Sequence, residues 1–196
     1  MEIKIKIQGK TPLLCNRFTD EATLVLEGKT SVCSTAGYKG TPKEIAQNKL
    51  YLDPVSDEPI IPQPNIFRCI LDAGKFFKAG KIKVTTQKSS LIPACLDMDE
   101  ISYTILHEDP WEVDSRPVRN PSTGGRVIAH RPLFHDWALE FGVVLDTTIM
   151  NENLFRDIVD KAGSAIGLGD FRPDCKGPFG KFVVTKWEIV PLEQTG

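Results

Sequence analysis

Hydrophobic and polar residues alternate strictly at the start of the chain. From Glu2 to Gln8, an isoleucine occupies every second position and polar residues fill the positions between. Successive side chains of a β-strand point to opposite faces, so this period of two predicts a half-buried strand over 2–8. One face of that strand is expected to pack on the core.

Two later segments repeat their apolar residues every three or four positions, as an amphipathic helix does. They run over 65–78 and 151–162. A shorter helix is predicted to begin after Thr41, because Pro42 suits the first helical position and Glu44 completes a capping box.

The other segments with strand character lie between turn-forming residues. They are 58–62, 81–86, 101–106, 113–120, 126–136, 137–145 and 181–190, and the pattern also allows a strand at 23–26. The segments 113–120 and 126–136 resemble the arms of a hairpin whose tip is Pro121–Gly125.

The strongest elements follow the order strand 2–8, helix 65–78, strands 113–146, helix 151–162 and strand 181–190. This β-α-β-β-α-β order predicts an α+β, ferredoxin-like or RRM-like core. Two helices would cover one face of an antiparallel sheet, and the other face and the loops would be left to bind. We expect a single domain over 1–196, with insertions near 16–58 and a β-hairpin near 113–137.

The stretch from Ala162 to Gly180 contains five glycines and two prolines. Such a composition excludes a regular helix or strand and lets backbone N–H groups approach a ligand closely. Arg172 and Lys176 lie within it and favour an anionic ligand. An equally good interpretation is that Gly163 or Gly167 merely ends the preceding helix.

Composition limits the classes of function. The chain has 196 residues, 41% hydrophobic and 26% charged, which fits one globular domain with a real core. Its net charge of −2 argues against a generic nucleic-acid binder. Five cysteines without a C-x-x-C pair favour a reduced, cytoplasmic setting and no zinc site. We expect no signal peptide, no membrane span and no cofactor.

Charge is segregated along the chain, which permits one basic face on an acidic body. Residues 61–90 hold six basic side chains against Asp72 alone, and 91–112 hold only acids. Between 114 and 135 the arginines outnumber the single Asp114. These arginines flank the hairpin tip and favour phosphate contact over a merely solvated face. They are Arg116, Arg119, Arg126 and Arg131.

Two segments carry a resemblance to a known family. Pro62–Leu71, a proline loop opening a basic amphipathic helix, and Gly167–Gly180, a glycine-rich loop before the last strand, resemble landmarks of the RAMP superfamily. These are the repeat-associated RNA-binding proteins of CRISPR effector complexes, which serve antiviral defence. The similarity is greatest to the backbone subunit that polymerises along a guide RNA, and the hairpin near 113–137 resembles its thumb.

The resemblance implies a non-enzymatic, cytoplasmic chain that holds single-stranded RNA by its phosphates. The implied partners are that RNA and other copies of the chain, or other subunits of a ribonucleoprotein complex. The residues that it implicates are Asn65, Arg68, Gly167, Gly169, Arg172 and Lys176. We add Lys75, which shares the polar face of its helix with Arg68. Phe171 is a candidate for stacking on bases, although anchoring the loop to the core is at least as good an interpretation.

Two alternatives have different chemistry. His130 or His135 could cut RNA by metal-independent acid–base catalysis, with Arg131 beside His130 to stabilise the phosphate. A loop aspartate, Asp20, is a weaker candidate for RNA cleavage. The acidic stretch from Asp97 to Glu112 favours instead an interaction protein of a phage or mobile element, such as a mimic or inhibitor of a CRISPR complex. We predict no catalytic residue and no metal site.

Overall fold

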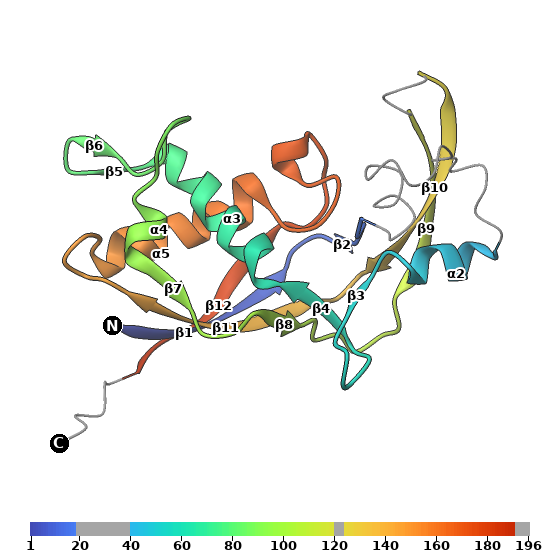
Figure 1. Cartoon of the computed structure of the whole chain (residues 1–196), viewed down its shortest axis with the longest axis horizontal. Helices are drawn as coiled ribbons and strands as arrows, with labels where there is room; N and C mark the ends of the chain where they lie inside the picture. The colour runs from blue at the N-terminus through green and yellow to red at the C-terminus, as the bar shows by residue number, and fades with distance from the viewer. Residues whose placement is uncertain (19–39, 120–123, 191–196) are drawn as a thin grey trace, which may run out of the picture.

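The central layer is a four-stranded antiparallel sheet. A computed structural model describes residues 1–18, 40–119 and 124–190 (Figure 1). The sheet contains β1 (Glu2–Gly9), β7 (Leu96–Met98), β11 (Ala138–Leu145) and β12 (Phe182–Val190), in the order β12-β1-β11-β7. The predicted strands 2–8, 137–145 and 181–190 are therefore all present, to within a residue or two.

Helices cover one face of this sheet. In Figure 1, α3 (Gln63–Ala73) and α5 (Glu152–Lys161) lie side by side above it, and the short α4 (Ile92–Cys95) lies near them. Ile3, Ile5 and Ile7 of β1 are buried in the core between the sheet and the helices. The order β1-α3-β7-β11-α5-β12 is the predicted β-α-β-β-α-β order, and the α+β, ferredoxin-like fold class is confirmed.

One strand of this order was misplaced. The second strand of the core is β7, which pairs with Val143–Leu145 at the edge of the sheet. The predicted hairpin belongs instead to another sheet, of β2 (Leu13–Leu14), β10 (Arg126–Phe134) and β9 (Glu112–Arg119) in that order. A three-residue strand is too short to show a period of two, whereas the long hairpin shows one clearly.

Smaller elements surround the core. A third sheet joins β3 (Tyr51–Leu52), β4 (Pro59–Pro62) and β8 (Ser102–Thr104), and β5 (Lys78–Ala79) pairs with β6 (Ile82–Lys83). The predicted strand 81–86 is thus only one short arm of a two-stranded ribbon. The helix predicted to reach residue 78 ends at Ala73 and is followed by a 3₁₀ turn, η1 (Gly74–Phe76).

The helix α2 (Pro42–Gln47) begins as predicted. The Thr41 hydroxyl accepts from the Glu44 backbone N–H, and the Glu44 carboxylate accepts from the Thr41 N–H, which completes the capping box. The strand that the pattern allowed at 23–26 lies outside the described residues.

The glycine-rich stretch begins as a helix, contrary to expectation. The helix α5 continues into one π-helical turn, η2 (Ala162–Ile166), that ends at Gly167 with φ of +76°. The interpretation of Gly167 as a helix stop is therefore confirmed. From here we call residues 167–180 the glycine loop, which contains the 3₁₀ turn η3 (Pro173–Cys175).

Within residues 1–18, 40–119 and 124–190, no helix combines the length and the apolar character needed to cross a bilayer.

Candidate nucleic-acid interface

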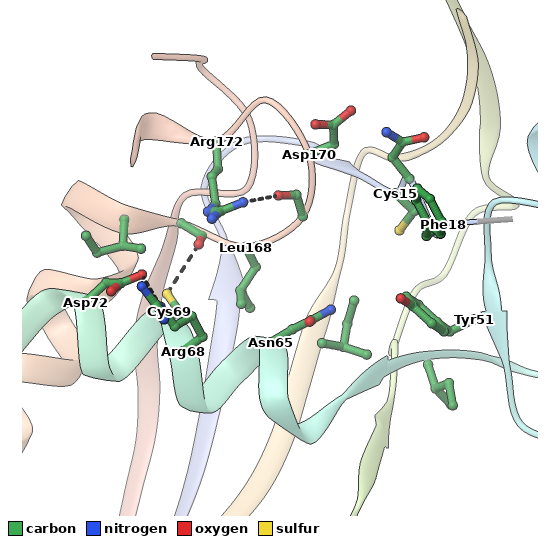
Figure 2. A pocket seen from close by; sticks show the side chains of 16 residues that line it. Cys15, Phe18, Tyr51, Asn65, Arg68, Cys69, Asp72, Leu168, Asp170 and Arg172 are labelled. Atoms are coloured by element: carbon green, nitrogen blue, oxygen red, sulfur yellow. Dashed lines mark hydrogen bonds and ion pairs between the residues drawn. The ribbon is translucent and has the colours of Figure 1, made fainter. Parts of the chain in front are cut away.

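A pocket of about 320 Å³ lies between α3 and the glycine loop (Figure 2). We call it the central groove. Five residues implicated from the sequence line it: Asn65, Arg68, Gly167, Gly169 and Arg172. The first two come from α3, and the other three come from a segment about a hundred positions later in the chain. The fold therefore brings the two landmark segments to one place.

The backbone of the glycine loop has a shape that other residues could not easily adopt. Gly167, Gly169 and Gly180 have φ values of +76°, +74° and +69°, in the left-handed region. The Leu168 N–H donates to the Gly180 carbonyl at 2.9 Å, and the Gly180 N–H donates to the Pro12 carbonyl at 2.8 Å. The loop is thus held by hydrogen bonds within its own backbone and to Pro12, which directly precedes β2.

A buried thiol joins the two walls of the groove. The Cys69 thiol on α3 donates to the Gly167 carbonyl at 3.3 Å, as the dashed line in Figure 2 shows. Burial raises the pKa of this thiol well above its usual range, so it stays protonated and remains a donor. This contact links α3 directly to the first residue of the glycine loop.

Charged side chains form the rim. The Arg68 Nε donates to Asp72 at 2.8 Å, the Lys75 Nζ donates to Asp174 at 2.8 Å, and the Arg172 Nη1 donates to the Gly169 carbonyl at 3.1 Å. The hydrogen bond from Lys75 holds the pKa of Asp174 below its ordinary value. Arg68 and Arg172 line the groove together with Asp72 and Asp170, whereas Lys75 and Asp174 lie outside its lining. The Arg68 side chain is 69% exposed and has further guanidinium donors to offer.

Aromatic side chains lie at the far end of the groove from Arg68. Figure 2 shows Phe18 and Tyr51 together there, and they are 55% and 37% exposed. Exposed rings beside a groove that also holds arginine side chains are suited to stacking on unpaired bases. The sequence analysis missed both residues, since each is a single aromatic in a polar segment with no periodic pattern around it.

The two phenylalanines of the glycine loop have different roles. Phe179 is buried against Leu14 and Leu133, so it anchors the loop. Phe171 is 40% exposed and has a φ of +47°, a conformation that bulky residues rarely adopt. Lys176 is also exposed, after η3, and neither it nor Phe171 lines the central groove.

The hairpin arginines do not share one face. Arg119 pairs directly with Arg126, so both exposed side chains lie on the same side of the ribbon. Arg116 is an odd number of residues away from Arg119 and lies on the other side. There it donates to Asp114 at 2.6 Å, and its guanidinium lies 4.8 Å from the centre of the Phe179 ring.

Arg131 is not at the surface, which corrects the expectation that its guanidinium meets phosphate. Its side chain is 7% exposed, and it donates to Asp170 at 2.7 Å and to Asp114 at 3.4 Å. The sequence analysis counted the single acid near the hairpin and missed Asp170, which the glycine loop contributes. We therefore remove Arg131 from the candidate contacts.

His130 and Arg131 do not form the catalytic pair that the sequence suggested. His130 and Arg131 are adjacent in β10 and so point to opposite faces. His130 Nδ1 lies 2.7 Å from the Ser115 hydroxyl, and His135 Nε2 lies 3.1 Å from the Glu112 carboxylate. No cluster of three or more potential metal ligands occurs within 1–18, 40–119 and 124–190. Asp20 lies outside the described residues.

The face of the central sheet that the helices leave uncovered has different side chains from the central groove. Its outward positions on β1 and β11 carry no aromatic residue, and its lysines are mixed with glutamates. Lys6 pairs with Glu140 at 2.8 Å, and Lys186 pairs with Glu188 at 2.8 Å. Such a surface offers neither a stacking platform nor a continuous positive field, so the central groove is the better candidate for a nucleic acid.

Comparison with known proteins places the fold. No protein-family model matches the sequence, and no curated protein matches it either. Among solved structures, one chain of the cryo-EM structure of the Type III-B Cmr-beta bound to cognate target RNA is similar, with a TM-score of 0.56 and 13% sequence identity. The match covers 96% of this chain and 60% of that one, so this chain spans about three fifths of its neighbour's length. The chain thus shares its fold with a subunit of a Type III-B Cmr complex.

Proposed function

We propose that this chain binds single-stranded RNA by its phosphate backbone, along the central groove, as a subunit of a CRISPR-type ribonucleoprotein complex. One observation carries the proposal. Asn65 and Arg68 on α3 meet Gly167, Gly169 and Arg172 of the glycine loop around a single pocket. The resemblance implicated these residues before their positions were known.

The chemistry of the groove suits this ligand. The guanidinium groups of Arg68 and Arg172 line the groove and favour phosphate oxygens. The rings of Phe18, Tyr51 and Phe171 are exposed at or near the groove and can stack on bases without reading their sequence. Contacts of this kind do not depend on the identity of the bases, so they suit a guide RNA whose sequence varies.

The hairpin supports a second region of contact. Arg119 and Arg126 are directly opposite each other, and like charges at such positions destabilise a β-ribbon by themselves. A phosphate between the two side chains would relieve that repulsion. The structural neighbour, a chain of Cmr-beta bound to target RNA, favours an RNA ligand and assembly with other subunits or copies.

The alternatives are less well supported. Cleavage by His130 with Arg131 lacks its geometry, since the two side chains point to opposite faces and Arg131 is buried. An interaction protein without RNA is the alternative that the following experiment separates from our proposal.

The experiment measures binding of a labelled single-stranded RNA by fluorescence anisotropy. The Arg68→Glu/Arg172→Glu variant is expected to bind about tenfold or more weakly at low salt, because phosphate contacts supply most of the affinity. Lys4→Glu/Lys186→Glu is the matched control, with the same change of charge on the open face of the sheet. Equal binding by both variants, or no binding by the natural protein, would contradict the proposal.

A further inference from the structure

A second groove lies on the other side of the Arg68–Asp72 pair. It has a volume of about 770 Å³ and runs between α3 and the segment 83–90. Its charged lining consists of Arg68, Lys75, Lys83 and Lys88 against Asp72. We call it the lysine groove. Neither the sequence analysis nor the proposed function gives it a role.

The lysine groove and the central groove meet. Arg68 and Asp72 line both of them, so this ion pair is the shared wall. Lys75 lies in the 3₁₀ turn η1 that directly follows α3, and it lines the lysine groove together with Arg68. The cations of the two grooves therefore form one track along α3 rather than two separate patches.

The outer wall is built onto the helix by a close contact. A Cβ atom at Gly74 would meet the Thr85 hydroxyl, so a glycine lets this segment approach the end of α3. The Thr85 hydroxyl donates to the Leu71 carbonyl at 2.8 Å and lies 2.8 Å from the Ser90 hydroxyl. Thr85 is buried, and these bonds fix the wall against the helix.

A hydrogen-bonded turn presents Lys88. The Thr86 N–H donates to the Ser89 carbonyl at 2.8 Å, which closes the turn. The Thr86 hydroxyl accepts from the Ser89 N–H at 3.1 Å and from the Lys88 N–H at 3.3 Å. The backbone that carries Lys88 is therefore held in place before any ligand arrives.

The charge balance of the lysine groove favours an anion. Arg68 is paired with Asp72, and Lys75 is paired with Asp174 from outside the lining, so Lys83 and Lys88 give the groove its net positive charge. Lys83 is also directly opposite Lys78 in the β5–β6 ribbon, a pairing of like charges that is unfavourable on its own. A polyanion across this groove would offset both effects.

We infer that the RNA strand continues from the central groove past Arg68 and places its next phosphates against Lys75, Lys83 and Lys88. This inference rests on the proposed function and extends the site. Asn65 and Ala73, the last residue of α3, are eight positions apart, and Lys75 follows in η1. That separation is ~12 Å along a helix, or roughly three to four phosphates at the spacing of one stacked strand.

The test compares two RNA lengths, about 6 and about 12 nucleotides, within the range of known single-strand sites. Lys83→Glu/Lys88→Glu is expected to weaken binding of the longer RNA by about tenfold and to reduce the salt slope by about 1.4, for two lost phosphate contacts. Binding of the shorter RNA should change less than about twofold, since the central groove holds it. The control is again Lys4→Glu/Lys186→Glu.

The outcomes separate the two proposals. If the natural protein binds the longer RNA and the Lys83→Glu/Lys88→Glu variant binds it as the control does, the lysine groove is not part of the site. If the natural protein binds neither RNA, both the inference and the proposed function are wrong. Both lysines are exposed, so the variant keeps its fold, and matching melting curves check this.

Discussion

The guanidinium of Arg131, on β10, donates to the Asp170 carboxylate of the glycine loop at 2.7 Å. The same guanidinium reaches Asp114 on β9 at 3.4 Å. The hairpin and the loop are thus joined by a largely buried ion pair, and Asp170 itself lines the central groove. The role of Arg131 is to position this wall, not to contact RNA.

Loss of Asp114 should destabilise the protein. Asp114→Asn removes the buried carboxylate that faces Arg131 and Arg116. Arg131 keeps its ion pair with Asp170, so the cost is about 1–3 kcal/mol, for the lost hydrogen bonds to a charged group. The free energy of unfolding in urea measures this loss. Glu112→Gln is the control, since Glu112 is 69% exposed in its contact with His135 and should change stability by under ~1 kcal/mol. Equal effects of the two changes would show that the Arg131 cluster does not support the fold.

A methyl group at Gly180 should damage the groove. Gly180 has φ of +69°, and its Cβ would collide with the Leu168 carbonyl. Gly80 has a similar φ of +60° but open space around it. Gly80→Ala should therefore cost about 1–2 kcal/mol for the backbone alone. Gly180→Ala should cost about 1–3 kcal/mol more for the collision and should also weaken RNA binding. Thermal melting of the two variants checks the difference, and equal melting temperatures would contradict the account of the loop.

The Lys75–Asp174 pair should respond to acid. Lys75 lowers the pKa of Asp174 below its ordinary value of 3.8. A depressed folded pKa stabilises the protein above the unfolded pKa, and this contribution disappears as the pH falls through the folded value. NMR titration should therefore place Asp174 below 3.8, and Lys75→Met should raise it toward 3.8. A pKa of Asp174 that does not change in the variant would mean that the pair is absent in solution.

Cysteine reactivity should follow burial. Burial raises the pKa of Cys15 to about 12 and shifts those of Cys69 and Cys95 upward as well, whereas Cys175 is exposed on η3. The thiolate is the reactive form, so iodoacetamide at pH near 8 should modify Cys175 before Cys15, Cys69 and Cys95. Peptide mass mapping of the native protein checks this order. Rapid modification of Cys15 or Cys69 would mean that solvent and reagent reach the bottom of the central groove, which these residues line.

Local periodicity was enough to predict much of the fold. The alternation of Ile3, Ile5 and Ile7 with polar residues predicted β1, and apolar spacing predicted α3 and α5, because each pattern spans two or more turns or pleats. The strand β7 has three residues and no such pattern. Its place in the sheet follows from pairing with β11, which is a tertiary contact.

The sequence predicted only those site residues that lie in recognisable short segments. Asn65, Arg68 and the loop glycines were found because the segments that carry them, Pro62–Leu71 and Gly167–Gly180, resemble landmarks of the RAMP superfamily. Arg131 was misplaced because its partner Asp170 is 39 residues away in the sequence. Phe18 and Tyr51 join the groove only through the packing of distant segments. No feature of the sequence shows that the groove continues toward Lys88.

The most direct test of the central claim is to map RNA contacts by ultraviolet cross-linking of single-stranded RNA that contains 4-thiouridine, followed by mass spectrometry. The account predicts cross-linked peptides from α3 and the glycine loop, with Phe18, Tyr51 or Phe171 among the modified residues. Cross-links confined to the open face of the sheet, on β1 and β12, would contradict it.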